Sequence, residues 1–358
     1  MVGIETAKAT GDRLIGHTQD TAHPEGLPRA SDFVTIDCPV SDPGPGHVVV
    51  RNLAFRVSAS LNAMLRAQAE SIAGIPHPPL TPGDILFGAA VGEVIAAPPG
   101  SPLAVGEHVL HYLGWREYAS APIASCTAID RNADLVSTLG HGATAYAALT
   151  RGIRIAPGDT VLVTAGGSAI GSVAGPLARL LGASRVIATT SSRTKARRLI
   201  HELGYDAALI RDSDEGFAQQ LQRAAPDGVD VLVDNVGGEQ LTAALDAARP
   251  HARFVLLGAL SEQLSERPSP QHALTPNLFI LPARGVLLRG YSADDDPDAA
   301  GEWRTRSSQW VAEGRLQLPR TVASGLSAAA PLLSSTIAGD VLGVALIDLR
   351  DSGETAPS

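Results

Sequence analysis

The chain has 358 residues, with 28 Lys and Arg against 37 Asp and Glu, so its formal net charge is −9 at pH 7. This acidic balance argues against binding to nucleic acid or to an anionic membrane, both of which need clustered basic residues. No run of about 18 apolar residues is present, so we expect no membrane span. Two cysteines, Cys38 and Cys126, are too few for a disulfide framework or a cysteine-based zinc site, and they fit a reducing cytoplasm.

The N-terminal part of the chain predicts an irregular β-rich domain. Residues 1–30 are polar and predict a loose arm or one edge strand. Short apolar runs then follow at 47–55, 88–97 and 107–113, separated by clusters of Gly and Pro. Short strands separated in this way are typical of a β domain or barrel.

From about residue 138 the pattern changes to alternating strands and helices. This alternation predicts an α/β domain with a parallel sheet that is covered by helices on both faces. A final apolar run at 343–349 could return to the first domain. The predicted strands lie at 160–165, 185–190, 229–236, 253–260 and 285–293, and helices are predicted after 170 and at 194–204 and 239–248.

A glycine-rich loop follows the first of these strands. Gly166, Gly167 and Gly171 lie directly between the strand at 160–165 and an amphipathic helix. Glycine at such a junction lets the backbone turn sharply and approach a pyrophosphate, which the helix N-terminus can bind. A plain tight turn is the alternative interpretation. The strand before the loop, the helix after it and a second strand about 20 residues further on favour dinucleotide binding.

The end of the second strand, at 185–190, predicts which dinucleotide is bound. A site for NAD usually places Asp or Glu there, where it binds the ribose 2′-hydroxyl. This chain instead has Ser191, Arg193 and Lys195, and Arg211 follows the next strand. These residues favour the 2′-phosphate of NADP(H), although a solvated helix start with ordinary basic residues would look similar.

Further motifs accompany the glycine loop across residues 33–349. With them the chain resembles the zinc-independent branch of the medium-chain dehydrogenase/reductase superfamily, and within it the alkenal/one double-bond reductases that include the prostaglandin reductases. These motifs are GAAVGEV (88–94), LGWREYA (113–119), GATAYAAL (142–149), ELGYDAA (202–208), GVDVLVDNVGG (228–238), RFVLLGAL (253–260) and AEGRL (312–316).

The resemblance implies both a fold and an activity. We expect a GroES-like β-rich catalytic domain over residues 1–135 and 321–358, and a Rossmann domain with a doubly wound parallel sheet over 136–320. The implied reaction is NADPH-dependent hydride transfer to the β carbon of an enone or enal, with a small-molecule substrate, in a homodimer. Metal is not expected, because the GHE motif and the four-cysteine lobe of the zinc-containing members are absent.

Cofactor-binding residues are also implied by the resemblance. Lys195 matches the lysine that meets the 2′-phosphate, Thr144 would lie close to the nicotinamide, and Asn235 would lie near the cofactor. The complete expected set is Thr144, Gly166, Gly167, Ser168, Ile170, Gly171, Ser191, Arg193, Lys195, Arg211, Asn235 and Gly258.

The substrate side departs from the family pattern. A VDPYMRGRM-like stretch is replaced by VSASLNAML (57–65), a tyrosine is missing from SEQLS (261–265), and an NxGK-like element becomes VLGV (341–344). Ser168 stands where the family's loop has its middle glycine. The loss of arginines from 57–65 predicts a neutral, apolar substrate, with secondary metabolites among the candidates.

No catalytic acid is dictated by the sequence. An enolate formed by hydride transfer needs a hydrogen-bond donor and then a proton. Tyr118 and Tyr146 are the candidate phenols, although a buried tyrosine is more often a core residue. Two alternatives to enone reduction stay open: a quinone oxidoreductase, or a biosynthetic cyclase, isomerase or nucleotide sensor with altered chemistry on the same fold.

Overall fold

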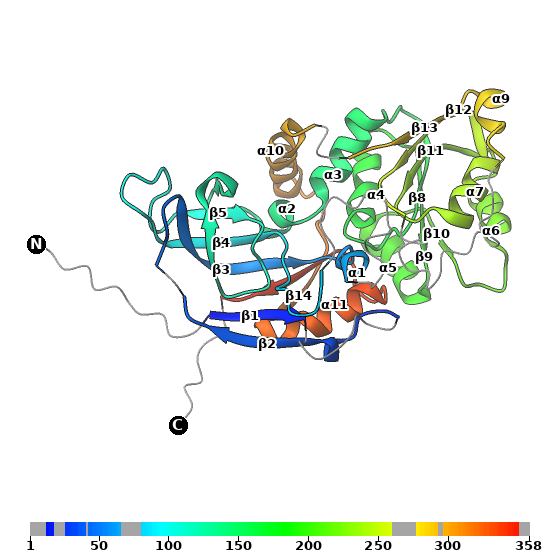
Figure 1. Cartoon of the computed structure of the whole chain (residues 1–358). Coiled ribbons are helices and arrows are strands. Elements are labelled where there is room, and N and C mark those ends of the chain that lie inside the picture. The colour runs from blue at the N-terminus through cyan, green and yellow to red at the C-terminus, as the bar shows by residue number, and fades with distance from the viewer. Residues whose placement is uncertain are drawn as a thin grey trace, which may run out of the picture. The chain divides into compact units, whose positions relative to one another are not determined.

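The computed structural model describes residues 12–17, 26–40, 42–65, 80–259, 277–292 and 296–350. The chain divides into two compact units (Figure 1). Unit 1 consists of Met1–Leu139, Val322–Ala338 and Ala345–Ser358, and unit 2 consists of Gly140–Thr321 and Gly339–Val344. The chain therefore passes from unit 1 to unit 2 and back twice.

Unit 2 is a doubly wound α/β domain. Its six strands are parallel and follow the order β10-β9-β8-β11-β12-β13, so the sheet is extended first in one direction from β8 and then in the other. The strands are β8 (Thr160–Val163), β9 (Arg185–Thr190), β10 (Ala207–Ile210), β11 (Val229–Asp234), β12 (Ala248–Leu256) and β13 (Leu287–Gly290). The helices are α3 (Gly142–Ala147), α4 (Gly171–Leu180), α5 (Arg193–Leu203), α6 (Phe217–Ala224), α7 (Gly238–Asp246), α9 (Ile280–Arg284) and α10 (Asp298–Ala312).

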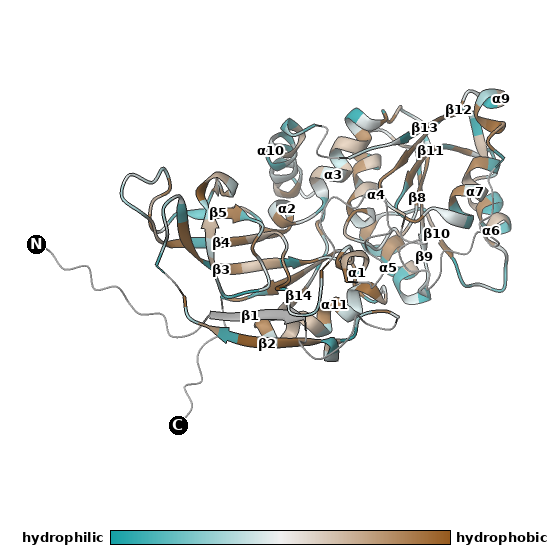
Figure 2. Ribbon diagram, in the orientation of Figure 1, coloured by the Kyte–Doolittle hydropathy of each residue, from teal (hydrophilic) through white to brown (hydrophobic). Residues whose placement is uncertain are grey.

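Helices cover both faces of this sheet, because its central strands are apolar on both sides. Val161 and Val163 of β8 pack in one hydrophobic cluster with residues of α3, α4, α5 and α10. Leu162, between them, packs in a second cluster with residues of α6 and α7. Figure 2 shows the central strands as hydrophobic. Alternate side chains of a strand point to opposite faces, so a strand that is apolar throughout must be buried on both.

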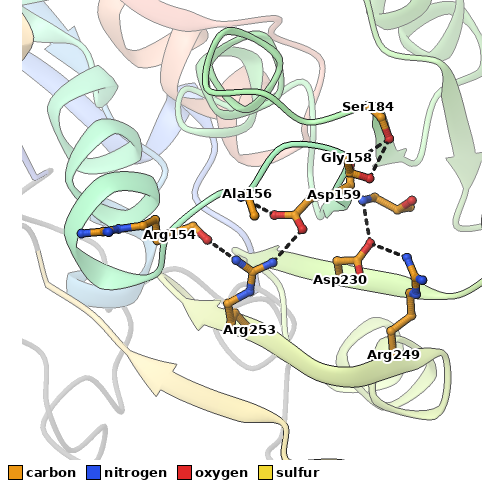
Figure 3. Close-up of polar contacts among 9 residues, drawn as sticks. Arg154, Ala156, Gly158, Asp159, Ser184, Asp230, Arg249 and Arg253 are labelled. Atoms are coloured by element: carbon orange, nitrogen blue, oxygen red, sulfur yellow. Dashed lines mark hydrogen bonds and ion pairs between the residues drawn. The ribbon is translucent and has the colours of Figure 1, made fainter.

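Hydrogen bonds and ion pairs join the start of β8 to the neighbouring strands (Figure 3). The Asp159 carboxylate, 8% exposed, accepts a hydrogen bond from the Ala156 N–H at 2.6 Å and pairs with Arg253 of β12 at 2.7 Å. Asp230 of β11 accepts from the Thr160 N–H at 2.9 Å and pairs with Arg249. These carboxylates therefore tie the amino ends of three neighbouring strands together.

Unit 1 is built on an antiparallel sheet. The order is β14-β15-β3-β4-β5-β7, and β6 also pairs with β3. Its strands are β3 (His47–Val57), β4 (Ala90–Ala96), β5 (His108–His111), β6 (Tyr118–Pro122), β7 (Thr127–Ile129), β14 (Arg320–Ser324) and β15 (Val344–Asp348). The helices α1 (Leu61–Met64), α2 (Leu135–Leu139) and α11 (Ala329–Ile337) accompany it. Val48, Val50, Val94 and Val109 form part of its core.

A separate two-stranded ladder precedes this sheet. β1 (Asp12–His17) pairs antiparallel with β2 (Phe33–Cys38). One strand thus lies within residues 1–30, for which an arm or an edge strand was predicted, while 1–11 and 18–25 lie outside the described residues. The predicted fold class, a β-rich domain together with a doubly wound parallel-sheet domain, is confirmed.

Candidate cofactor-binding site

The strand order of unit 2 creates a topological switch point between β8 and β11. From these two adjacent strands the chain proceeds in opposite directions, so the connections that leave their carboxyl ends run to opposite sides. Ligands of doubly wound sheets bind at this point. The glycine loop follows β8, and Asn235 follows β11 directly, so the fold brings these two sequence-predicted elements together.

The loop after β8 leaves no space for a Cβ atom at two of its glycines. A Cβ atom at Gly166 would lie 2.6 Å from the Cβ of Ala188 in β9, and one at Gly171 would collide with the carbonyl oxygen of Ala165. Ala165 itself has a φ of +50°, a left-handed conformation that costs energy for a residue with a Cβ. The backbone is thus held in the tight turn that a pyrophosphate-binding loop requires.

Residues outside the glycine motif hold this turn in place. The Thr189 hydroxyl accepts a hydrogen bond from the Ala165 N–H at 2.9 Å. The Thr189 carbonyl accepts another from the Gly166 N–H, also at 2.9 Å. The Tyr205 hydroxyl donates to the Gly171 carbonyl at 2.6 Å, and a Cβ at Gly175 would collide with the Tyr205 ring. Neither Thr189 nor Tyr205 was predicted from sequence. The position of Tyr205 in the ELGYDAA motif was the only signal.

Two hydrogen bonds to Thr164 hold Asn235 at the end of β8 and leave the side-chain oxygen of Asn235 available as an acceptor. Its Nδ2 donates to the Thr164 carbonyl at 2.9 Å, and its backbone N–H donates to the Thr164 hydroxyl at 2.7 Å. The buried Asn235 Oδ1 has no hydrogen-bond partner among the described residues. Buried acceptors are rarely left without a donor, so this atom fits a ligand that supplies one. The loop and Asn235 together fit a dinucleotide.

The residues predicted for the 2′-phosphate lie at the ends of β9 and β10. Ser191 and Arg193 are exposed, and Ser192 caps α5 by accepting from the Lys195 N–H at 3.3 Å. Arg211 is brought beside Thr190 by the β9–β10 pairing and forms an exposed ion pair with Asp212 at 2.9 Å. Four of the predicted residues are therefore clustered within unit 2, at the strand ends next to the glycine loop.

Lys195 is held by a distant part of the chain. Its Nζ donates to the carbonyls of Gly339 and of Val341, the latter at 2.5 Å. Partial burial lowers the pKa of Lys195, and the neighbouring Asp340 opposes that effect. The Gly343 N–H also donates to the Gly167 carbonyl at 3.0 Å. Residues 339–344 thus contact both the glycine loop and Lys195, the lysine predicted to meet the 2′-phosphate, through their main chain, so the VLGV element does not need the missing Asn and Lys for these contacts.

The remaining predicted cofactor residues are distributed around the loop. The Ser168 hydroxyl accepts from the Gly171 N–H at 3.0 Å, and Ile170 immediately precedes α4. A Cβ at Gly258 would lie 3.1 Å from the Asn235 carbonyl oxygen, so Gly258 closely approaches that residue. Thr144 lies in α3.

The two candidate phenols have different surroundings. Tyr146 is buried against Trp303 and Trp310 of α10, and its hydroxyl donates to Glu302 at 3.2 Å. Burial, aided by the Glu302 hydrogen bond, raises the pKa of Tyr146 above its usual range. Tyr118 begins β6 in unit 1 and lies opposite Arg51. The SEQLS segment lies outside the described residues.

Two features are absent from the part of the chain that the structure describes. Within the described ranges, no group of three or more His, Cys, Asp and Glu side chains is placed to hold a metal ion. No helix in the same ranges has both the length and the hydrophobicity needed to span a membrane.

Known proteins resemble this chain along most of its length. A family model described as zinc-binding dehydrogenase matches residues 169–293, and one described as the N-terminal domain of oxidoreductase matches residues 19–129. The 2-alkenal reductase (NADP(+)-dependent) of Nicotiana tabacum is 28% identical, covering 89% of this chain and 92% of its own. The NADPH-dependent curcumin reductase of Escherichia coli is 26% identical, covering 91% of this chain and 94% of its own.

A solved structure shows the same fold. The crystal structure of CurA from Vibrio vulnificus in complex with NADPH superposes with a TM-score of 0.82 at 24% identity, covering 94% of this chain and 98% of that one. The two family models and the NADP-dependent relatives confirm the resemblance to the medium-chain dehydrogenase/reductase superfamily that the sequence motifs indicated. The relatives of this chain include reductases of the alkenal type.

Proposed function

We propose that this protein is an NADP-dependent oxidoreductase that transfers a hydride from NADPH to the activated C=C bond of an enone or enal. The observation that carries the proposal is the switch point of the sheet, where a loop with no room for a Cβ at Gly166 or Gly171 lies beside a buried Asn235 oxygen that has no donor among the described residues. Cationic side chains, with no carboxylate in the Ser191–Lys195 segment that follows β9, support NADPH over NADH. Relatives named as alkenal and curcumin reductases support the reaction.

Each element of the site has a part in this function. The glycine loop lets the pyrophosphate approach its backbone closely, and the positive end of the α4 dipole favours the negative charge of the pyrophosphate. Lys195 and Arg211 attract the 2′-phosphate, and Asn235 accepts a hydrogen bond through Oδ1. The bound cofactor supplies the hydride. Tyr146 already donates to Glu302, so we propose that solvent supplies the proton.

The substrate we propose has an apolar body, as secondary metabolites often do. Leu61, Met64 and Phe87 line a hollow of unit 1 and support this choice. The predicted neutrality depended on the absence of arginine from residues 57–65. Arg56, one residue earlier, also lines this hollow, and the neutrality of the substrate stays a prediction.

We also propose a cytoplasmic homodimer. Cys38 and Cys126 are both free thiols, which fits a reducing compartment. β13 lies at one end of the six-stranded order in the described sheet, and Leu287 on it is 48% exposed. An exposed apolar edge of this kind can pair with a second copy, which continues the sheet across the interface.

The decisive experiment measures NADPH absorbance with a panel of enones, enals and quinones. Turnover of the enones or enals, with the saturated ketone or aldehyde as product, is expected. Turnover of quinones alone would replace our proposal with a quinone oxidoreductase. Tight NADPH binding without oxidation by any of them would point to a cyclase, an isomerase or a nucleotide sensor.

A further inference from the structure

The segment 339–344 of unit 2 carries an acidic residue between the two carbonyls that hold Lys195. The Lys195 Nζ donates to the carbonyl of Gly339 and, at 2.5 Å, to that of Val341. Asp340 stands between these two residues in the sequence and is exposed. The two hydrogen bonds therefore place the main chain of Asp340 beside the ammonium group of Lys195.

Contacts with the glycine loop hold the same arrangement from the other side. A Cβ atom at Gly167 would lie 3.5 Å from the Lys195 Cδ and 4.0 Å from its Nζ, so the lysine side chain passes close to that glycine. The Gly343 N–H donates to the Gly167 carbonyl at 3.0 Å. The glycine loop, Lys195 and the main chain around Asp340 are thus connected within unit 2.

The ammonium group of Lys195 keeps its charge in this arrangement. Its two partners are neutral carbonyl oxygens, and an ammonium has three N–H donors, so one donor is left over. Partial burial lowers the pKa of Lys195, and the Asp340 carboxylate opposes that effect. Lys195 is only half-buried, so it keeps its proton at neutral pH without this help.

A carboxylate at this position therefore matters more for a ligand than for Lys195 itself. NADPH carries a 2′-phosphate with nearly two negative charges, whereas NADH carries a hydroxyl at the same atom. If Lys195 meets the 2′-phosphate, as the sequence predicts, the Asp340 carboxylate lies near that phosphate and repels it. The repulsion applies to NADPH and not to NADH.

The second cation predicted for the phosphate already has an acidic partner. The Arg211 Nε and Nη2 donate to the two carboxylate oxygens of Asp212 at 3.0 and 2.9 Å, so one edge of the guanidinium is occupied. Binding of the 2′-phosphate thus depends strongly on Lys195 and on the charges that surround it.

We propose that Asp340 is a specificity-determining residue, whose carboxylate limits the preference of this site for a 2′-phosphorylated nucleotide. The inference rests on the proposed function for the identity of the cofactor, and it adds a residue that sets how strongly NADPH is preferred over NADH. The effect is electrostatic, so Asp340 acts on binding and takes no part in hydride transfer.

The test measures the dissociation constants of NADPH and NADH by titration of cofactor fluorescence, with no substrate present. Asp340→Asn removes the charge and nearly preserves the shape of the side chain. We expect NADPH to bind at least about threefold more tightly, because an exposed charge pair is worth up to about fivefold and the phosphate carries nearly two charges. NADH binding should be unchanged. In about 0.5 M salt the gain should largely disappear, because salt screens exposed charges.

Two further variants separate charge at this position from other effects. Asp340→Glu retains the charge and should keep the wild-type ratio of the two dissociation constants. Asp246→Asn removes an exposed carboxylate at the end of α7, just before β12 and so at the opposite edge of the sheet from the glycine loop. This control changes the net charge equally and should leave the ratio unchanged.

The outcomes distinguish the inference from the proposed function. Tighter NADPH binding in Asp340→Asn alone would support the inference, even if no enone is reduced. Unchanged NADPH binding in Asp340→Asn, with the wild-type protein still binding NADPH, would overturn the inference alone. Equal tightening in Asp246→Asn or in Asp340→Glu would also overturn it, because the effect would then not depend on the charge at residue 340. Failure of the wild-type protein to bind NADPH would overturn both.

Discussion

At the scale of single residues, Lys195 sets the expected preference between the two cofactors. Lys195→Ala should weaken NADPH binding at least about tenfold and leave NADH binding almost unchanged, because one charge-assisted contact to a phosphate is worth about 1.5–3 kcal/mol. Titrations of cofactor fluorescence measure both affinities. Arg197→Ala, which removes an exposed arginine of the same helix, is the control. Equal affinity of the wild-type protein for the two cofactors would contradict this role.

His111 makes the stability of unit 1 depend on pH. It is buried, its Nε2 lies 2.8 Å from Asn52 Oδ1, and its Nδ1 accepts the Leu113 N–H. A second proton would have to break the Leu113 contact. Burial, with a smaller contribution from Arg116, lowers the pKa of His111 to about 4.

The folded protein therefore takes up this proton later than the unfolded chain as the pH falls. The contribution of His111 to the free energy of unfolding is fully present above about pH 6.5. It decreases as the pH falls, and the total loss by about pH 4 is about 3 kcal/mol. Urea unfolding, followed by circular dichroism at several pH values in this window, measures the loss. His111→Gln should make the free energy of unfolding less dependent on pH between pH 6.5 and 5. His201→Gln, which replaces an exposed histidine, should leave that dependence unchanged. The same pH slope in both variants would count against His111.

The two candidate phenols test whether solvent supplies the proton. Tyr146→Phe and Tyr118→Phe should each change turnover less than about tenfold, whereas loss of a general acid costs about 10²–10⁴-fold. Steady-state kinetics with the best enone, at equal NADPH saturation, measures this. A hundredfold loss in either variant, with its fold intact, would identify a dedicated tyrosine acid.

At the scale of secondary-structure elements, the carboxylate at the start of β8 holds neighbouring strands together. Asp159→Ala leaves Arg253 and the Ala156 N–H without their partner, and it should lower the free energy of unfolding by about 3 kcal/mol. NADPH affinity of the folded protein should be unchanged, because the glycine loop lies at the other end of β8. Chemical denaturation and a cofactor titration measure the two quantities.

An exposed ion pair in the same unit provides the comparison. Glu202→Ala breaks the pair with Arg198 on α5, where both side chains are nearly half exposed, and should change the free energy of unfolding far less than Asp159→Ala does, because solvent screens an exposed pair. If Asp159→Ala cost no more than Glu202→Ala, the network at the start of β8 would contribute little to stability.

Elements whose signals are contiguous in the sequence could be predicted. The glycine loop, the strand before it and the helix after it occupy one short stretch, and the apolar strands of unit 2 are recognisable individually. The Lys195 contacts could not be predicted, because Gly339 and Val341 lie far along the chain and contribute only main-chain carbonyls. The hollow around Arg56 escaped prediction for a similar reason, since Phe87 and Tyr112 reach it from separate segments.

At the scale of the whole molecule, the edge of the unit 2 sheet determines the expected assembly. Leu287 on β13 and Phe279 before α9 are 48% and 74% exposed. Light scattering at micromolar concentration should give the mass of a dimer, and Leu287→Lys should shift it to that of a monomer. Val311→Lys, at an exposed apolar residue of α10, should leave the dimer intact. A monomeric wild-type protein would contradict this assembly.

The late position of β15 has a consequence for synthesis on the ribosome. β15 pairs with β3, although all of unit 2 except residues 339–344 is translated between them. The edge of β3 that β15 covers therefore stays open while most of unit 2 is made, and an open strand edge invites wrong pairing. Unit 2 likewise receives residues 339–344, which contact its glycine loop, only near the end of translation. The glycine loop and the antiparallel sheet of unit 1 therefore receive their last contacts almost together, from segments that lie within a few residues of one another in the sequence.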